Sequence, residues 1–188
     1  MENGTRNRWR PTNCSKARAL TNSVEEERLD ISEIIPELLW IGSSPNREDW
    51  TRLRNEIGPK LIVIDLTRNL EEEVECQKQG VRYDDRTPRI EEDYSPIPIT
   101  KLKLVSRIID DDISSGRKVF LHCKAGSGRS PTCAAAYLVH CGTSLPEARE
   151  MIANKREAWN GRDAEYAGHL AEFAKIQEIS RVENPSFM

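Results

Sequence analysis

The sequence predicts an α/β fold: a single domain in which a central, mostly parallel, twisted sheet carries helices on both faces. Two short, β-branched and nearly all-apolar runs, residues 61–66 and 119–122, are typical of strands buried on both faces of a sheet. Segments rich in helix-forming residues lie between and after these runs, and such alternation favours helices packed on a parallel sheet. The length of 188 residues is that of one domain.

The remaining strands are predicted from breaks in the chain. Residues 31–42 carry closely spaced isoleucines and leucines around Pro36 and end at Gly42, which predicts short extended segments joined by a turn. Residues 81–83 follow Gly80 and supply a further short strand. Helices are expected over residues 46–56, 70–79 and 100–114.

The C-terminal third is predicted to be helical. Its three helices are expected over residues 131–141, before Gly142, residues 145–159, with Pro146 in the first turn, and residues 162–178, after Gly161. Residues 1–30 are polar and have too few apolar side chains to build a core. We therefore expect a flexible N-terminal tail over 1–30, a folded domain over 31–180 and a C-terminal tail over 181–188.

Composition excludes several classes of function. The 28 Lys and Arg nearly balance the 31 Asp and Glu, so no overall field attracts a polyanion, and no nucleic-acid partner is expected. Five cysteines without paired spacing fit a reducing, intracellular compartment, most simply the cytoplasm. The apolar runs are far shorter than the roughly 20 residues of a membrane-spanning helix, so we expect no transmembrane segment.

Residues 119–131 carry the chemistry, because there an apolar strand runs into a glycine-rich loop and then into a helix. Consecutive backbone N–H groups of residues 124–129 can converge on one anion, and the free N–H groups of the helix start add positive potential. Gly126 and Gly128 permit positive φ angles and a close approach of the backbone. The segment predicts a phosphate-binding loop. It lacks the spacing of a Walker loop, and Pro131 breaks a dinucleotide fingerprint.

Four side chains of this segment suit phosphoryl transfer. The field of the loop favours the thiolate of Cys123, which makes it a nucleophile. Arg129 offers a planar fork for two phosphoryl oxygens and tightens on the transition state. Ser130 can donate its hydroxyl to the sulfur and improve it as a leaving group. We expect His122 to orient the loop by hydrogen bonding.

The pattern His-Cys-x-x-Gly-x-x-Arg-Ser of residues 122–130 resembles the signature of the cysteine-dependent protein-tyrosine phosphatase superfamily, and the chain resembles its small, dual-specificity type. The resemblance implies a two-step reaction through a cysteinyl-phosphate, without metal or other cofactor. It implies Cys123 as nucleophile, Ser130 as its assistant, and phosphate binding by Lys124, Ala125, Gly126, Ser127, Gly128 and Arg129. Pro131 departs from many members but is tolerated in a first helical turn.

The leaving oxygen needs a proton, so a carboxylic acid is required opposite the loop. Candidates lie at Asp84 and Asp85, at Asp93, and at residues 110–112, which we interpret as surface charges. In the resembling family the acid stands about thirty residues before the cysteine, upstream of a proline and a helix, and Asp93 fits that placement. Glu91 and Glu92 remain fallback candidates. Asp65, at the end of a buried strand, is interpreted as structural.

The expected substrates are proteins carrying phosphotyrosine, phosphoserine or phosphothreonine. The resemblance implies this breadth, because the chain is shorter than the domains of strict tyrosine phosphatases in the family, and a shallower pocket admits phosphoserine and phosphothreonine as well. A phospholipid, phosphoinositide or other non-protein phosphate is the alternative. The Lys124-Ala125-Gly126 filling of the loop also resembles mitochondrial phosphatidylglycerophosphate phosphatases, and a lysine suits polyanionic head groups. A non-catalytic phospho-binding module is least favoured, because Cys123, Arg129 and the candidate acid Asp93 are all present.

Overall fold

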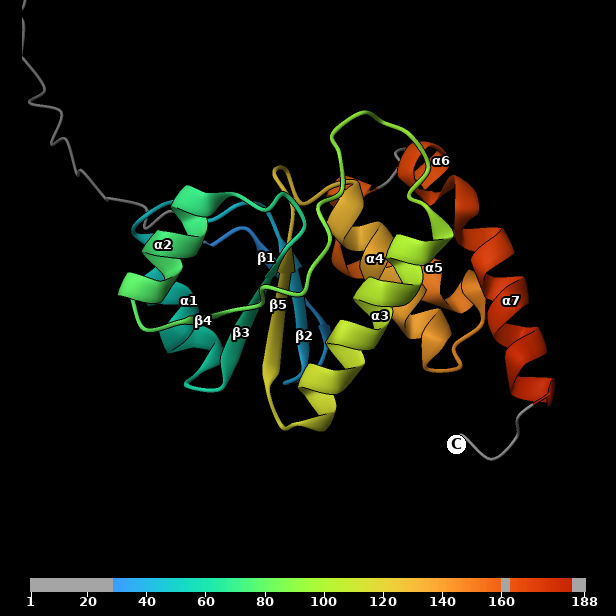
Figure 1. Cartoon of the computed structure of the whole chain (residues 1–188), viewed down its shortest axis with the longest axis horizontal. Coiled ribbons are helices and arrows are strands. Elements are labelled where there is room, and N and C mark those ends of the chain that lie inside the picture. Colours follow the sequence, from blue (N-terminus) through green and yellow to red (C-terminus); the bar gives the residue numbers. More distant parts are fainter. Residues whose placement is uncertain (1–28, 160–162, 184–188) are drawn as a thin grey trace, which may run out of the picture.

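A five-stranded sheet forms the centre of the structure, in the strand order β1-β2-β5-β3-β4 (Figure 1). Its strands are β1 Ile31–Ile35, β2 Leu39–Gly42, β3 Leu61–Asp65, β4 Arg82–Tyr83 and β5 Lys118–His122. Only β1 and β2 pair antiparallel, and the other neighbouring pairs in this sheet are parallel. The predicted, mostly parallel sheet is confirmed.

The computed structural model describes residues 29–159 and 163–183. Most of the expected N-terminal tail, residues 1–28, and residues 184–188 of the expected C-terminal tail lie outside the described residues. Within those two described ranges, no helix combines the length and the apolar character needed to cross a membrane.

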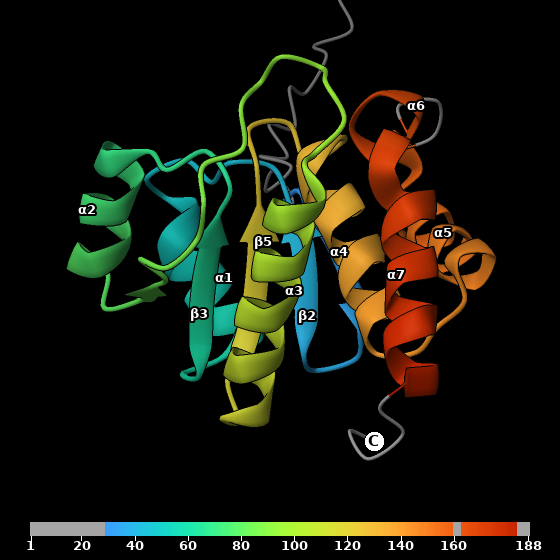
Figure 2. The same cartoon turned by 45° about the vertical axis from the view of Figure 1, so that its right-hand side comes forward.

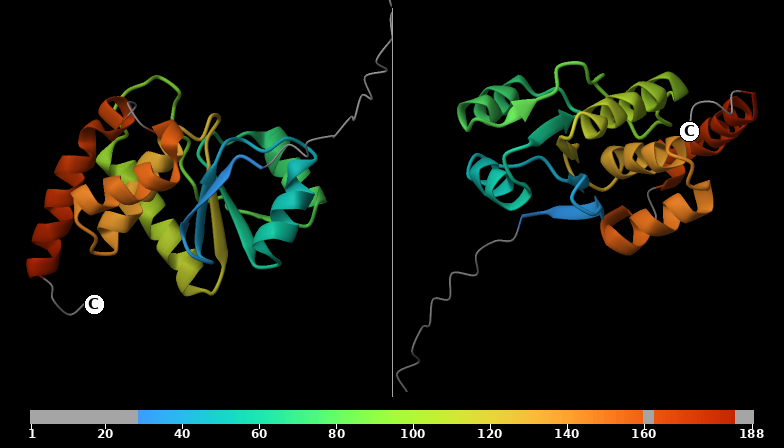
Figure 3. Two further views of the ribbon diagram at one scale, coloured as in Figure 1. Left: turned by 180° about the vertical axis from the view of Figure 1, so that it is seen from behind. Right: turned by 90° about the horizontal axis from the view of Figure 1, so that it is seen from below.

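Helices cover both faces of the sheet, as Figure 2 and the view from below in Figure 3 show. On one face lie α1 and α2, and on the other lie α3, α4, α5 and α7. The helical elements are α1 Asp49–Ile57, α2 Leu70–Lys78, α3 Ile99–Ser114, α4 Arg129–His140, α5 Leu145–Lys155, the 3₁₀ turn Glu157–Trp159, α6 Asp163–Tyr166, the 3₁₀ turn Ala167–His169, and α7 Leu170–Glu183.

Each face of the sheet has its own core, because side chains alternate along a strand. Val63 and Phe120 belong to the cluster under α1 and α2, together with the fully buried Trp50. Ile64 and Leu121 belong to the larger cluster under α3, α4, α5 and α7. The nearly all-apolar strands β3 and β5 are therefore buried on both sides, as their sequences predict.

Local capping explains where two helices begin. Ser144 directly precedes α5, and its side chain accepts from the backbone N–H of Glu147. The carboxylate of Glu147 accepts in turn from the backbone N–H of Ser144, so the two residues form a capping box at the start of α5. Asn69 caps α2 by accepting from the backbone N–H of Glu71. Three glutamates follow in the first turn of α2, where the helix dipole favours negative charge.

Several helix boundaries differ from those predicted. The helix expected over residues 162–178 is broken into α6, a 3₁₀ turn and α7. The break contains Gly168, and a Cβ there would lie 2.8 Å from Cγ of Pro96. The α4 helix starts at Arg129 rather than at residue 131, because the loop turns directly into the helix. The α5 helix ends at Lys155, where Arg156 leaves helical geometry with φ −135° and ψ 79°.

The carboxyl ends of three strands meet at one edge of the sheet. Gly42 of β2 and Asp65 of β3 both lie opposite His122 of β5. In open α/β sheets ligands bind outside the carboxyl ends of the strands. The predicted phosphate-binding loop leaves β5 at this edge.

Candidate active site

Residues 123–129, called here the phosphate-binding loop, connect β5 to α4. Its glycines are required by close packing. Gly126 has φ +62°, and a Cβ there would lie 2.5 Å from the backbone carbon of Gly42. A Cβ on Gly128 would lie 2.6 Å from the ring of Tyr166. The loop is thus pressed against β2 on one side and an aromatic ring on the other.

Most carbonyls of the loop are held by groups of the surrounding scaffold. The carbonyl of Cys123 accepts from His122 Nδ1 at 3.3 Å, and that of Lys124 accepts from Ser44 N at 3.1 Å. The carbonyl of Gly126 accepts from Arg156 Nε at 2.9 Å, and that of Gly128 accepts from Thr132 N at 3.1 Å. In a planar trans peptide the N–H points opposite to the C=O. The N–H groups of residues 124, 125, 127 and 129 therefore face away from these scaffold groups, as an anion nest requires.

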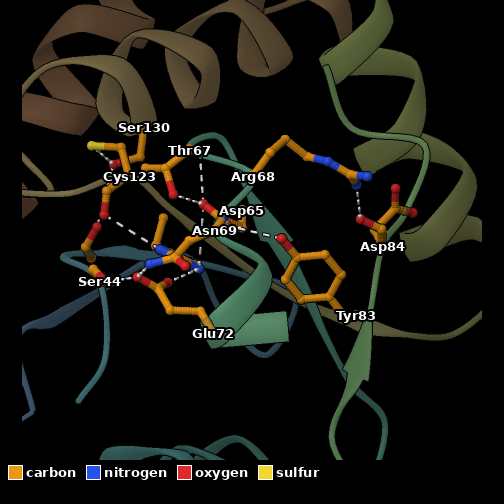
Figure 4. Close-up of polar contacts among 12 residues, drawn as sticks. Ser44, Asp65, Thr67, Arg68, Asn69, Glu72, Tyr83, Asp84, Cys123 and Ser130 are labelled. Carbon is orange, nitrogen blue, oxygen red and sulfur yellow. Dashed lines mark hydrogen bonds and ion pairs between the residues drawn. The ribbon is translucent and has the colours of Figure 1, made fainter. Parts of the chain in front are cut away.

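Cys123 is 2% exposed and lies at the start of the loop. Its Sγ is 3.4 Å from Oγ of Ser130, which is fully buried in the first turn of α4 (Figure 4). Ser130 Oγ is also 3.4 Å from the carbonyl of Gly42. The serine hydroxyl can therefore direct its proton either to the sulfur or to β2, which suits the assisting role predicted for it.

Arg129 joins the loop to the segment that carries the candidate acids. Its guanidinium is almost fully buried, and Nη1 donates to the carbonyl of Ile90 at 2.9 Å. Nη2 lies 3.6 Å from Oε2 of Glu92, and Nζ of Lys124 lies 3.6 Å from the same oxygen. The carboxylate of Glu92 thus bridges two cations of the loop.

Asp93 lies between two anchored neighbours. Glu92 on one side pairs with Arg129 and Lys124, and on the other side Tyr94 N donates to the hydroxyl of Tyr166 at 3.3 Å. Asp93 itself is exposed, and its Oδ1 accepts from Ser95 N at 3.0 Å. The structure therefore brings the segment of Asp93 to the loop, while Glu92 makes the direct contact.

Two other acids considered from the sequence are committed to ion pairs. Asp84 is buried and pairs with Arg86 at 2.6 Å. Asp112 is fully buried and pairs with Arg86 at 2.9 Å and with Arg117 at 2.6 Å. The interpretation of Asp112 as a surface charge is wrong, because its side chain is buried. Ion pairs with the two arginines compensate the cost of burying its charge in α3.

Arg156 is a site residue that the sequence did not indicate. It is 6% exposed, and besides donating to Gly126 it pairs with both carboxylate oxygens of Asp30 at 2.5 and 2.7 Å. Hydrogen bonding from Arg156 holds the pKa of Asp30 below its usual value against the effect of partial burial. No spacing relates these two residues to the signature, so only the folded chain reveals them.

Comparison with known proteins places the chain in a family. Residues 41–176 match the model of the dual specificity phosphatase catalytic domain. The curated protein 123R of Invertebrate iridescent virus 6, which carries a tyrosine phosphatase name, is 39% identical over 56 residues. That match spans 29% of this chain and only 39% of the length of the viral protein.

Solved structures share the fold. PTPMT1 superposes with a TM-score of 0.64 at 24% identity, over 82% of this chain and 99% of that one. PTPMT1 in complex with PI(5)P gives 0.63 at 24% identity, over 80% and 98%. Human DUSP28 gives 0.62 at 20% identity, over 80% and 97%. The family match over most of the chain confirms the resemblance seen in residues 122–130: the chain belongs to the dual specificity phosphatase catalytic domain family.

Proposed function

We propose that the chain hydrolyses phosphate monoesters in two steps through a cysteinyl-phosphate at Cys123. The observation that carries the proposal is the loop of residues 123–129, whose carbonyls are tied to the scaffold while its N–H groups face the opposite side. Cys123 and Arg129 stand at its two ends. A phosphoryl group bound there lies within reach of both.

In the first step the Cys123 thiolate attacks phosphorus and the bond from phosphorus to the ester oxygen breaks. Arg129 binds two phosphoryl oxygens, which requires its Nη2 to exchange the 3.6 Å contact with Glu92 for phosphate. The leaving oxygen takes a proton from the carboxyl group of Asp93. The products are the alcohol and the cysteinyl-phosphate.

In the second step water attacks phosphorus, its proton passes to the Asp93 carboxylate, and the sulfur–phosphorus bond breaks. Ser130 stabilises the released thiolate by donating its hydroxyl across the 3.4 Å contact. Inorganic phosphate leaves, and Asp93 is again protonated for the next turnover.

We infer that phosphoproteins are the substrates. An aromatic pair stands beside the loop: the rings of Tyr94 and Tyr166 lie 5.7 Å apart, and Tyr94 is 52% exposed. Tyr166 also packs over Gly128. An exposed aromatic ring at the mouth of an anion site suits contact with a phosphotyrosine ring or a peptide side chain.

A phospholipid head group is the second candidate. Lys124 has a side chain 70% exposed at the loop and can reach an additional phosphate. PTPMT1, which shares the fold, has been solved with PI(5)P. The argument from Lys124 and the argument from the PTPMT1 complex both concern recognition of the phosphate, and neither concerns recognition of the lipid chains.

We propose an intracellular, cytoplasmic location, because a thiolate nucleophile is open to oxidation and is kept reduced there. The described cysteines support this, because Cys76, Cys123, Cys133 and Cys141 are all free.

Hydrolysis of an activated aryl phosphate tests the chemistry, with Cys123→Ser and Arg129→Lys as matched variants. We expect turnover by the wild type and its loss in both variants while both stay folded by circular dichroism. Undiminished turnover by folded Cys123→Ser would contradict the proposal. A panel of phosphopeptides and of vesicles containing phosphoinositides then separates the two substrate classes, and we expect the higher kcat/KM on phosphopeptides.

A further inference from the structure

The segment that carries Asp93 is attached to the rest of the domain at few points. Its residues 91–96, here called the acid segment, are all exposed. In Figures 1 and 2 the chain between β4 and α3 arches over the edge of the sheet and comes down beside α6. Among residues 29–159 and 163–183, the N–H of Tyr94 is the one backbone group of the acid segment that hydrogen-bonds to another segment, and its partner is the hydroxyl of Tyr166.

Tyr166 is a residue of α6 that touches both the acid segment and the phosphate-binding loop. Its side chain is 3% exposed. Its hydroxyl oxygen accepts from Tyr94 N at 3.3 Å, and its carbonyl accepts from Ile97 N at 3.0 Å. Its ring lies against Gly128, where an added Cβ would be 2.6 Å from Cδ2 and 2.7 Å from Cε2. One buried side chain therefore connects the residue after Asp93 to the residue before Arg129.

The residues that follow Tyr166 hold the end of the acid segment. A Cβ on Gly168 would lie 2.8 Å from Cγ of Pro96, so the chain can approach Pro96 closely at this glycine. His169 Nδ1 lies 3.1 Å from the carbonyl of Ile97, which is itself buried. The acid segment therefore has a fixed end at Ile97, and the hydroxyl of Tyr166 ties its middle.

Tyr94 has a backbone conformation that depends on its surroundings. Its φ is +57°, in the left-handed region that residues with large side chains rarely adopt. Such a conformation persists where neighbouring contacts determine it. Here Tyr166 supplies them, because its hydroxyl accepts from Tyr94 N and the two rings lie 5.7 Å apart at an angle of 35°. The turn at Tyr94 sets the path of the chain at Asp93, the residue directly before it.

The other attachment of the acid segment is given up when a substrate binds. The carboxylate of Glu92 lies 3.6 Å from Arg129 and from Lys124, and a phosphoryl group replaces it at Arg129. The hydrogen bond from Tyr94 to Tyr166 involves none of these charged groups, so phosphate does not displace it. Burial raises the pKa of Tyr166, and its hydroxyl therefore stays neutral at the pH of the reaction.

We propose that Tyr166 is a positioning residue that holds the acid segment in place over the phosphate-binding loop, so that the carboxyl group of Asp93 meets the leaving oxygen. The proposal rests on the proposed role of Asp93 as proton donor. Tyr166 acts through the backbone of Tyr94 and takes no part in the proton transfer. Loss of its hydroxyl should therefore slow the step that needs a proton, while binding of phosphate stays unchanged as long as the ring covers Gly128.

Tyr166→Phe removes the hydroxyl and keeps the ring. We expect kcat/KM for a phosphate ester with a poor leaving group to fall about tenfold, because general acid catalysis depends on the placement of the donor. Hydrolysis of an activated aryl phosphate and the inhibition constant of inorganic phosphate should stay unchanged. Tyr137→Phe is the matched control and should alter none of the three quantities. It removes another buried tyrosine hydroxyl, which bonds to Cys141 near the other end of α4.

A double variant shows whether Tyr166 acts through Asp93. If it does, Tyr166→Phe adds no further loss to Asp93→Asn on the poor leaving group, because the donor is already absent. Losses that multiply in the double variant, or equal losses on both esters in Tyr166→Phe, would overturn the proposal. A leaving-group effect in Asp93→Asn with none in Tyr166→Phe would overturn it while the proposed acid stands, so the two proposals can fail separately.

Amide hydrogen exchange at Tyr94 measures the attachment without turnover. The Tyr94 N–H should be protected in the wild type, should exchange about tenfold faster in Tyr166→Phe, and should be unchanged in Tyr137→Phe. The amides of β5 report in the same experiment whether each variant is folded. An unprotected Tyr94 N–H in the wild type would overturn the proposal even if Tyr166→Phe does not fold. So would equal exchange in the wild type and in folded Tyr166→Phe.

Discussion

Arg156 pairs with both carboxylate oxygens of Asp30 while its Nε donates to the carbonyl of Gly126. The residue directly before β1 and the residue directly after α5 therefore support the phosphate-binding loop together. The arrangement depends on the planar guanidinium, which can present three N–H groups in fixed directions.

Arg156→Lys should lower kcat/KM about tenfold, because the loop carbonyl at Gly126 loses its donor and the nest loosens. It should also lower the free energy of unfolding by about 1–2 kcal/mol through the lost charge-assisted hydrogen bonds. Steady-state kinetics and urea denaturation measure the two effects. Arg82→Lys, on an exposed position of β4, is the control and should change neither. Equal behaviour of the two variants would contradict a supporting role for Arg156.

Asp30→Asn should cost stability in a pH-dependent manner. The pKa of Asp30 is lowered in the folded chain, chiefly by hydrogen bonding from Arg156, so its contribution is present above the unfolded value near 3.8 and is lost as pH falls through the folded value. Because Asp30 is partly exposed, we expect a difference of roughly 1 kcal/mol at neutral pH that disappears in acid. Urea denaturation of both proteins at several pH values checks this. A difference that grows toward acid would be inconsistent with the ion pair.

Asp93→Asn should reduce hydrolysis of a phosphate ester with a poor leaving group about 100-fold, because the leaving oxygen loses its proton donor. Hydrolysis of an activated aryl phosphate, whose leaving group needs little protonation, should fall far less. The ratio of the two rates is the measurement, and the descending alkaline limb of the pH profile should flatten with it. If Glu92→Gln rather than Asp93→Asn shows the leaving-group dependence, Glu92 is the acid.

Glu92→Gln should strengthen phosphate binding. The Glu92 carboxylate lies 3.6 Å from both Arg129 and Lys124, and a phosphoryl group must replace it at Arg129. Without that competing charge, the inhibition constant of inorganic phosphate should fall about threefold, the range of a partly exposed ion pair. Competitive inhibition at low salt measures it. An inhibition constant that rises would show that Glu92 helps to hold the loop open for phosphate.

Gly126→Ala should unfold or inactivate the chain, because its Cβ would collide with Gly42 and with Arg156 at a positive φ. The expected loss is roughly 3 kcal/mol in the free energy of unfolding, combining backbone strain and overpacking. Gly142→Ala is the matched control, since it also has a positive φ but no atom within 4 Å of the added Cβ. Its cost should be about 1 kcal/mol, with full activity. If the two variants lost similar amounts of unfolding free energy, backbone strain alone would explain the effect, and the collision at Gly126 would not contribute.

Much of the fold could be predicted because local pattern and tertiary environment agree. The strands β3 and β5 are buried on both faces, as their apolar sequences indicate, and the capping pattern at Ser144 marks the start of α5. At the break in the helix expected over residues 162–178, Gly168 packs against Pro96. That contact joins distant segments, so no local pattern contains it.

The candidate site divides in the same way. The proposed nucleophile Cys123, Arg129 and the proposed assisting Ser130 lie within one continuous signature, and the folded chain places their side chains around one loop. Arg156 and the backbone of Ser44 donate to carbonyls of the loop, and Glu72 accepts from Oγ of Ser44. They come from three separate elements, and only the registration of strand ends at Gly42, Asp65 and His122 brings those elements together.

Rapid quenching of the enzyme with a phosphate ester, followed by mass spectrometry of its peptides, tests the central claim most directly. The account predicts that the mass of one phosphoryl group appears on the peptide that contains Cys123, that it decays with the rate of turnover, and that the corresponding peptide of Cys123→Ser does not gain it. Turnover by the wild type with no phosphorylated Cys123 at any quench time, under conditions that keep a cysteinyl-phosphate intact, would contradict the account.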